Sequence, residues 1–313
     1  MVHLKSFNHI HDLITPQQSW VEKIRGGLAS PFASTPSGIA YRNQRLYICD
    51  TAQSCVHIWN LATGYASKIG DSGNVTLEIP VDVAVDDNNN VYIADSGRGE
   101  VIIFNLSKNK VSHRLRPNNN EPMKPVALAV RAGKVYVADI ATHRILVYNT
   151  TSGNLETSFG RPGRDPGQFY FPMGIEATNN GQLLVSDSMN GQVQRFNKEF
   201  LPLTAIGGLG NRYGDMGRPR HLAIGPDGII FVADTEFARV HMFNNKGQLL
   251  MLLGGPDNKL GNTPMPTGLA IAPDLPPSLL ALIPPTFDAK YYLFVSNTLG
   301  SHRLSLYAMG NLR

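Results

Sequence analysis

Short apolar runs, each ending at an Asp or Asn, recur along the whole chain. They read RLYICD, NVYIAD, KVYVAD, QLLVSD, IIFVAD and YLFVSN, and they end at Asp50, Asp95, Asp139, Asp187, Asp234 and Asn297. Successive end points are 45, 44, 48, 47 and 63 residues apart. Self-similarity with a period of this size is typical of repeat architectures. The chain is therefore predicted to contain six copies of one structural unit.

Each unit contains four short segments with strand character. Upstream of each Asx residue lies an apolar run that begins with a proline, such as PSGIAY or PVDVAV. Downstream come a short loop, an alternating segment such as VIIFN or ILVYN, a turn rich in Gly or Asn, and a weaker fourth segment. Short alternating segments separated by turn residues predict antiparallel strands. One such sheet cannot bury both faces alone, whereas six sheets arranged around an axis can.

The unit resembles the NHL repeat, whose pattern is Pro-x-Gly-Ile-Ala, then Val-Tyr-Val-Ala-Asp, then Arg-Ile-x-Val-Phe. The resemblance runs from about Trp20 to Tyr307. It implies an all-β protein, a six-bladed β-propeller of four-stranded antiparallel blades.

The ends of the chain suggest how the ring closes. The sixth unit stops at HRLSLYAMG, so its fourth strand is missing, while SWVEKIRGG at residues 19–27 reads like the fourth strand of the other units. Residues 19–27 are therefore expected to complete the last blade, which protects two edges from aggregation. In this division, residues 1–18 form an N-terminal arm and residues 19–313 form the single propeller domain.

The composition is that of an ordinary globular chain. Of 313 residues, 42% are hydrophobic and 17% are charged, with a formal net charge of +4. No run of about 18 apolar residues occurs, so no membrane-spanning helix is predicted. The first residues lack the apolar segment and cleavage site of a signal peptide. The location stays unknown: either cytoplasmic, or a mature exported or organelle-lumen form.

The two cysteines, Cys49 and Cys55, flank a predicted hairpin loop. Whether they form a disulfide stays open, because hairpin geometry only sometimes suits a bridge.

The repeated Asx residues look chemical where Asp139 stands close to His143 and Arg144. Six-fold recurrence favours a structural role instead, because an Asx at a strand end can bond to the backbone of the next loop. In some units an Arg five residues downstream is expected to assist it. His57, His143 and His241 are likewise attributed to packing or loop structure, and no catalytic residue is predicted.

An enzyme is the first alternative. A metal-dependent lyase resembling the peptidylglycine amidating lyase would need several histidines at the central channel, and similar sugar-lactone hydrolases would need carboxylates there. The residues two positions after the repeated prolines are Gly38, Asp82, Ala127, Gly174, His221 and Gly268. Only Asp82 and His221 among them are suited to bind a metal. We therefore expect no metal and no cofactor.

Two basic loops form a candidate binding surface. The stretches GRPGRDPGQFYFP and GGLGNRYGDMGRPRH bring to one rim Arg161, Arg164, Tyr170, Arg212, Tyr213, Arg218, Arg220 and His221. Cationic side chains interleaved with aromatic ones suit single-stranded RNA, which makes an RNA-binding propeller the second alternative. Asp165 and Asp215 dilute the charge, so a protein partner is favoured over nucleic acid.

The sixth unit carries an insertion, PDLPPSLLALIPPTFDAKYY at residues 273–292, where the other units make a short turn. Its apolar residues are Leu279, Leu280, Leu282, Ile283 and Phe287. Apolar residues on a loop must cover something: either the loop folds back over the central channel, or it docks a partner.

The leading hypothesis is a non-catalytic scaffold that binds partner proteins, within a larger complex or by self-association. Fold analogy carries much of this hypothesis, and a fold alone does not establish a function.

Overall fold

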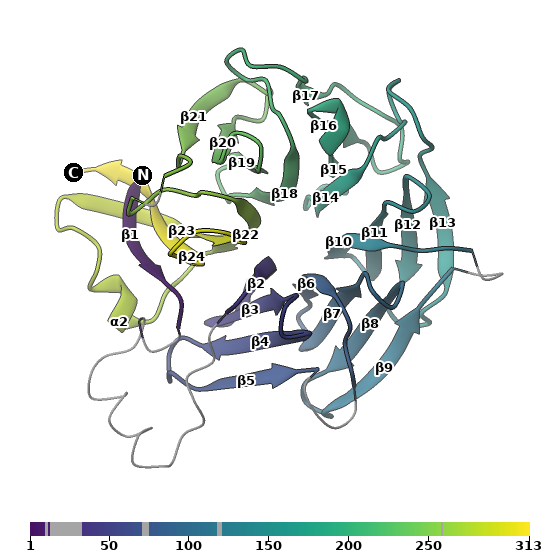
Figure 1. The fold of residues 1–313 in the computed structure, drawn as a ribbon, viewed down its shortest axis with the longest axis horizontal. Helices are drawn as coiled ribbons and strands as arrows, with labels where there is room; N and C mark the ends of the chain where they lie inside the picture. Colours follow the sequence, from purple (N-terminus) through teal and green to yellow (C-terminus); the bar gives the residue numbers. More distant parts are fainter. Residues whose placement is uncertain (10–11, 13–32, 71–74, 118–120, 258) are drawn as a thin grey trace.

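The structure, a computed structural model, describes residues 1–9, 12, 33–70, 75–117, 121–257 and 259–313. Within these residues, 24 strands form six four-stranded antiparallel sheets, which surround a central channel as the blades of a propeller (Figure 1). The predicted fold class is confirmed. No helix in the described part of the chain has the length and apolar character needed to cross a membrane.

The first three blades follow chain order from the innermost strand outward. Blade one contains β2 (Pro36–Arg42), β3 (Arg45–Asp50), β4 (Cys55–Asn60) and β5 (Ala66–Ile69). Blade two contains β6 (Pro80–Val85), β7 (Asn90–Asp95), β8 (Glu100–Asn105) and β9 (Lys110–Leu115). Blade three contains β10 (Pro125–Arg131), β11 (Lys134–Asp139), β12 (Arg144–Asn149) and β13 (Leu155–Phe159).

The next two blades repeat this arrangement. Blade four contains β14 (Pro172–Ala177), β15 (Leu183–Asp187), β16 (Gln192–Phe196) and β17 (Ile206–Gly207), with the short 3-10 helix η3 (Ser188–Asn190) after β15. Blade five contains β18 (Pro219–Ile224), β19 (Ile230–Asp234), β20 (Arg239–Phe243) and β21 (Leu249–Leu253).

Blade six joins the two ends of the chain. It contains β22 (Pro266–Ala272), the short helix α2 (Pro277–Leu280), β23 (Phe287–Asn297) and β24 (Leu304–Leu312), and its outer strand is β1 (Val2–Phe7). β1 pairs antiparallel with β24, from Val2 opposite Ala308 to Phe7 opposite Leu304. The predicted closure by an N-terminal strand is therefore confirmed.

The prediction that residues 19–27 supply this strand is wrong. The outer position of blade six belongs to residues 2–7, which were predicted to be part of the N-terminal arm. Residues 19–27 lie outside the described residues. The run VHLKSF places Val2, Leu4 and Phe7 against the core between blades six and one. Phe7 is only 1% exposed there. Burial of this side chain fixes the register of the closing strand.

The hydrophobic core lies between neighbouring blades. Six separate clusters of buried side chains each join two adjacent sheets. Alternate residues of each strand point to opposite faces of the sheet, so every blade contributes to the two clusters that flank it. This explains why the apolar runs in the sequence are nearly continuous: these strands are buried on both faces of the sheet.

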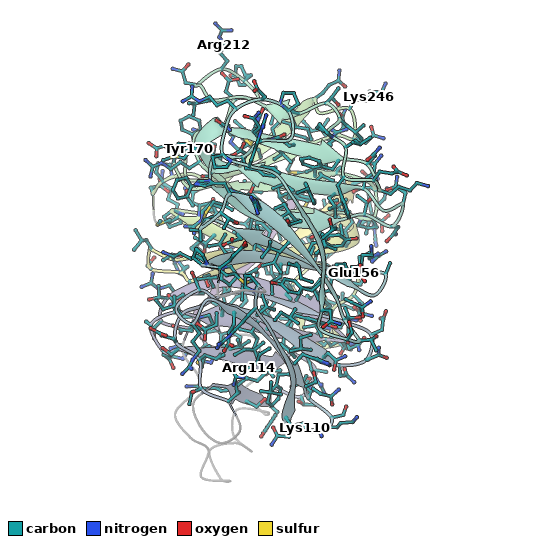
Figure 2. The ribbon with its side chains drawn as sticks, turned by 90° about the vertical axis from the view of Figure 1, so that its right-hand side faces the viewer. Lys110, Arg114, Glu156, Tyr170, Arg212 and Lys246 are labelled. Carbon is teal, nitrogen blue, oxygen red and sulfur yellow. The ribbon has the colours of Figure 1, made fainter. Side chains whose placement is uncertain are left out.

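The propeller has two distinct faces. The loop face carries the loops after the second strand of each blade and the connections between blades. The turn face carries the hairpins between first and second and between third and fourth strands. Seen from the side, Tyr170 lies on the loop face, while Glu156 and Lys246 lie on the opposite side (Figure 2).

The two cysteines are buried and do not form a disulfide. Cys49 is opposite Val56, and Cys55 is opposite Asp50. Because this offset of one position sends the two side chains to opposite faces of blade one, they do not form a bridge.

Candidate functional site

The Asp residues that end the second strands hold the loop face together. Asp50, Asp95 and Asp234 each accept backbone N–H bonds from the two residues that precede the proline of their own blade. Asp139 and Asp187 accept one such bond each, from Lys124 and Tyr170. All five Asp side chains are fully buried. These contacts tie each second strand to the connection arriving from the previous blade.

A partner seven residues downstream, which the sequence analysis missed, supports three of these carboxylates. His57 lies 3.3 Å from Asp50, His241 lies 3.4 Å from Asp234, and Gln194 donates to Asp187 at 3.2 Å. Burial disfavours the charged form of Asp50, but the His57 and backbone bonds outweigh it and hold its pKa below the usual value. Counting seven residues from each Asp would have found this pattern. In the described part of the chain, the arginine five residues downstream forms no hydrogen bond to Asp139 or Asp234.

Asn297 differs from the five Asp residues. Its Oδ1 is buried and has no hydrogen-bond partner among the residues that the structure describes. The residue two positions before the blade-six proline is Pro264, which has no N–H to donate. A carboxylate buried at this position would have fewer N–H donors than the carboxylates of the other blades. The neutral amide of Asn297 takes its place.

The central channel is crossed by a hydrogen bond between opposite blades. His221 of β18 reaches Asp82 of β6, with 3.2 Å between Nε2 and Oδ1. Asp82 also accepts the backbone N–H of Leu128 from blade three at 2.7 Å, and Nδ1 of His221 accepts that of Leu269 from blade six at 3.3 Å. The pair thus links four of the six blades.

Local backbone geometry sends both side chains inward. The register of every first strand shifts just after its proline. At this level the other blades carry Gly or Ala, as the sequence shows. A Cβ atom added to Gly38 would lie 2.1 Å from Oδ1 of Asp82. Small residues therefore leave room for the Asp82–His221 pair to span the channel.

Glu176 lies near this pair, two positions after Gly174 in β14 and therefore closer to the turn face. It lines a cavity of about 560 Å³ between blades four and five, together with Arg131, Arg195 and Asn245. Burial raises the pKa of Glu176 to about 7, although the nearby His221 opposes this shift. Burial lowers the pKa of His221, but Asp82 and Glu176 outweigh burial and leave it raised.

The free energy of unfolding is expected to decrease as pH rises, because of Glu176. The unfolded carboxyl ionises near its ordinary value of 4.5, whereas the folded one holds its proton until about pH 7. Stability is therefore full below pH 4.5 and declines as pH rises to 7, by about 1–3 kcal/mol once partial solvent access is considered. Glu176→Gln should remove this decline, as urea unfolding at several pH values would measure. Glu199→Gln at an exposed position is the control; an identical decline in both variants would contradict the assignment.

Metal-ligating side chains do not gather in threes within the residues that the structure describes. The two side chains with ligating atoms at the level just after the repeated prolines, Asp82 and His221, are bonded to each other and to backbone N–H groups. The donors present therefore do not fit a metal site of several free ligands.

The basic rim predicted from the sequence lies on the loop face, in the connections before blades four and five. Arg161, Arg164 and Arg212 are exposed, and within the described ranges none of them forms an ion pair. Arg218 pairs with Glu236 at 3.3 Å. Tyr213 is 95% exposed, and Tyr170 is 43% exposed.

Not every predicted rim residue belongs to this surface. His221 is in the channel, bonded to Asp82. Arg220 is partly buried, and burial lowers its pKa. His143, at the base of the rim, stacks on Tyr170 with 5.7 Å between ring centroids and accepts the Phe171 N–H. The accessible rim thus consists of Arg161, Arg164, Tyr170, Arg212, Tyr213 and Arg218.

A family profile described as NHL repeat matches residues 77–104, which cover most of blade two. The other five blades repeat the same strand order and the same buried Asx position. The chain is an NHL-repeat six-bladed β-propeller.

Solved structures with a similar fold include two lyases and a designed protein. A streptogramin B lyase shares 10% identity with this NHL propeller, with a TM-score of 0.61, and the match covers 89% of this chain and 84% of that one. A virginiamycin B lyase from Staphylococcus aureus shares 12%, with a TM-score of 0.60 and coverages of 88% and 85%. The computationally designed Ika8 protein shares 13%, with a TM-score of 0.52 and coverages of 90% and 72%. At these identities the likeness concerns the fold alone.

The insertion of this NHL propeller lies on the turn face, at the junction of blades six and one rather than over the channel (Figure 1). Leu279 and Phe287 are buried in the core cluster that contains Trp59, and Ile283 packs against it. Tyr41 of blade one donates to the carbonyl oxygen of Asp274 at 2.7 Å.

Both readings of the insertion therefore need correction. The channel-covering alternative is wrong, because the loop seals the seam where the ring closes. Phe287 begins β23, opposite Leu312, so the irregular part spans residues 273–286. Of the five apolar residues proposed to bind a partner, only Leu280 and Leu282 have substantially exposed side chains.

Proposed function

We propose that this propeller is a non-catalytic binding subunit that docks an acidic segment of a partner protein on the accessible rim of its loop face. The observation that carries the proposal is the exposure of Arg161, Arg164 and Arg212 without ion pairs in the described chain, beside the nearly fully exposed Tyr213. Aromatic and arginine side chains dominate the binding energy of protein interfaces. Leu209, which is 63% exposed on the same connection as Tyr213, adds apolar surface to the rim.

Charge distribution favours a protein over nucleic acid. Asp215 accepts the backbone N–H of Arg212, Asp165 bonds to Gln168, and Glu236 pairs with Arg218. These carboxylates interrupt the positive surface, whereas a phosphate backbone favours an unbroken run of cations. An acidic peptide can space its charges to match separate arginines, and the small net charge of +4 agrees with such local recognition.

Fluorescence anisotropy with two labelled probes tests this function: a short Glu-rich peptide containing Tyr, and a U-rich RNA of equal length. We expect the peptide to bind, more weakly as salt rises. The variant R161E/R164E/R212E should weaken binding at least tenfold, which is about 1.4 kcal/mol. The matched control is K108E/K110E/K198E, whose charge changes lie on the turn face. Binding of RNA alone would identify a nucleic-acid module, and binding of neither probe would contradict the proposal.

A second candidate is a lyase or hydrolase, favoured by Glu176, whose raised pKa of about 7 suits proton transfer near neutral pH. The cavity that Glu176 lines would hold the substrate. Two of the solved structures with a similar fold are lyases, which supports this candidate by analogy of fold alone. Failure of the protein to turn over either a sugar lactone or streptogramin B would remove this candidate.

A further inference from the structure

The outer strand of blade five differs in chemistry from the outer strands of blades one, two, three and six. β21 reads LLMLL and contains no charged or polar side chain. Leu250 is 51% exposed and Met251 is 44% exposed. In the described chain no further strand pairs with β21, which is the last strand of its sheet and lies on the periphery of the ring (Figure 1).

Register comparison makes the difference specific. Met251 is opposite Met242 of β20, and the residues at the equivalent place in the other regular blades are Ser67, His113, Thr157 and Lys5. One position later, where blade five has Leu252, these blades carry Lys68, Arg114, Ser158 and Ser6. Charged and polar residues on edge strands prevent pairing with other chains. Blade five lacks that protection.

The neighbouring blade extends the apolar edge. The segment before β17 runs along the outside of blade four, and it exposes Leu201 and Leu203 at 60% and 44%. The turn before β21 touches this blade, because a Cβ atom added to Gly247 would lie 3.2 Å from Ile206. Exposed apolar side chains thus follow the periphery from blade four to blade five.

We propose that β21 is a self-association edge, at which it pairs antiparallel with β21 of a second copy of this chain. The strand is complementary to itself, because apolar side chains meet apolar side chains across a two-fold axis. Its flanks are complementary in charge. Residues 247–256 carry no charge, with Lys246 on one side and Asp257 on the other. Lys246 lies in the turn before β21, and Asp257, which pairs with Lys259 at 3.1 Å, follows the strand, so antiparallel pairing of two copies of β21 brings the Lys246 end of each strand to the Asp257 end of the other.

The edge lies away from the accessible rim, so this inference is independent of the proposed function. Pairing of β21 with its copy would join two propellers edge to edge and leave both loop faces open. Each propeller would then offer its arginines and Tyr213 to a partner, and a dimer would present two rims. Loss of self-association therefore leaves peptide binding intact, and the rim variant leaves self-association intact.

Sedimentation velocity of the full chain over a dilution series tests the proposal. We expect a concentration-dependent shift from the mass of one chain to twice that mass. The variant L250E/M251T/L252S, which copies the Glu-Thr-Ser of β13, should lose the shift at an unchanged melting temperature. The control E156A/T157A/S158A on β13 should keep it. A wild-type chain that stays monomeric at every concentration, or a triple variant that dimerises like the wild type, would overturn the proposal.

Disulfide trapping reports on the register without depending on edge stability. Both native cysteines are fully buried, so an added surface cysteine reacts alone. Under mild oxidation M251C or L252C should give a covalent dimer, whereas T157C on blade three should not. Failure of both blade-five variants to cross-link at concentrations where the wild type dimerises would exclude β21 as the contact.

Discussion

Removal of residues 1–7 is expected to open the propeller and cause aggregation at temperatures where the intact chain stays folded. The deletion removes the outer strand of blade six and leaves β24 as an unpaired edge. It also removes Phe7, which is packed between Trp59 and Phe294. Exposed edge strands promote pairing between chains, so the loss of the strand acts on solubility as well as on stability.

The single substitution Phe7→Ala isolates the packing contribution. Truncation of a buried Phe costs about 3–5 kcal/mol, and the full deletion should cost more because backbone hydrogen bonds are lost too. Thermal unfolding followed by circular dichroism, with light scattering to detect aggregation, measures both effects. Leu312→Ala is the control: this side chain is exposed near the other end of the chain, so its truncation should change stability by less than about 1 kcal/mol. A deletion variant that stays monomeric with an unchanged melting temperature would contradict closure by β1.

Asp82→Ala is expected to destabilise the fold by about 3–5 kcal/mol, the cost of breaking a buried ionic pair by removing one partner. It leaves the Leu128 N–H and the His221 ring without an acceptor at the centre of the ring. Urea unfolding monitored by tryptophan fluorescence would measure the loss. Asp87→Ala is the control, because Asp87 is an exposed carboxylate that pairs with Arg42 on the surface.

The double variant D82A/H221A tests the coupling between the two channel residues. Removing the second partner also removes the unsatisfied ring, so the double variant should lose less stability than the sum of the single variants. Additive losses would show that the contact across the channel contributes nothing to holding blades two and five together.

Repetition explains how much of the fold could be predicted from the sequence. The same strand pattern occurs six times along the sequence, so a wrong strand assignment in one blade does not change the predicted architecture. The closing strand occurs once, without a second copy to check it, and SWVEKIRGG resembled a fourth strand more than VHLKSF did. Alternating Val2 and Leu4, followed by Phe7, was the available signal for β1.

The channel shows a different limit of prediction. Counting from the repeated prolines identified Asp82 and His221 as channel residues, but their contact depends on side-chain reach across the ring and on the small size of Gly38. Glu176 was missed because it stands two positions farther along its strand, where the other blades carry alanine. Burial of Leu279 was missed because a loop sequence does not reveal which seam it covers.

Closure by β1 has a consequence for synthesis of the chain. Val2 finds its partner, Ala308, only after all the strands that lie between them in the sequence have been made. At roughly 5–20 residues per second on the ribosome, the first strand to emerge stays without its partner for roughly 15–60 s. During that time blades one to five can form in order, and the N-terminal strand is free to pair wrongly with another nascent chain. Of the propeller strands, the one translated first is therefore the last to take its place in the ring.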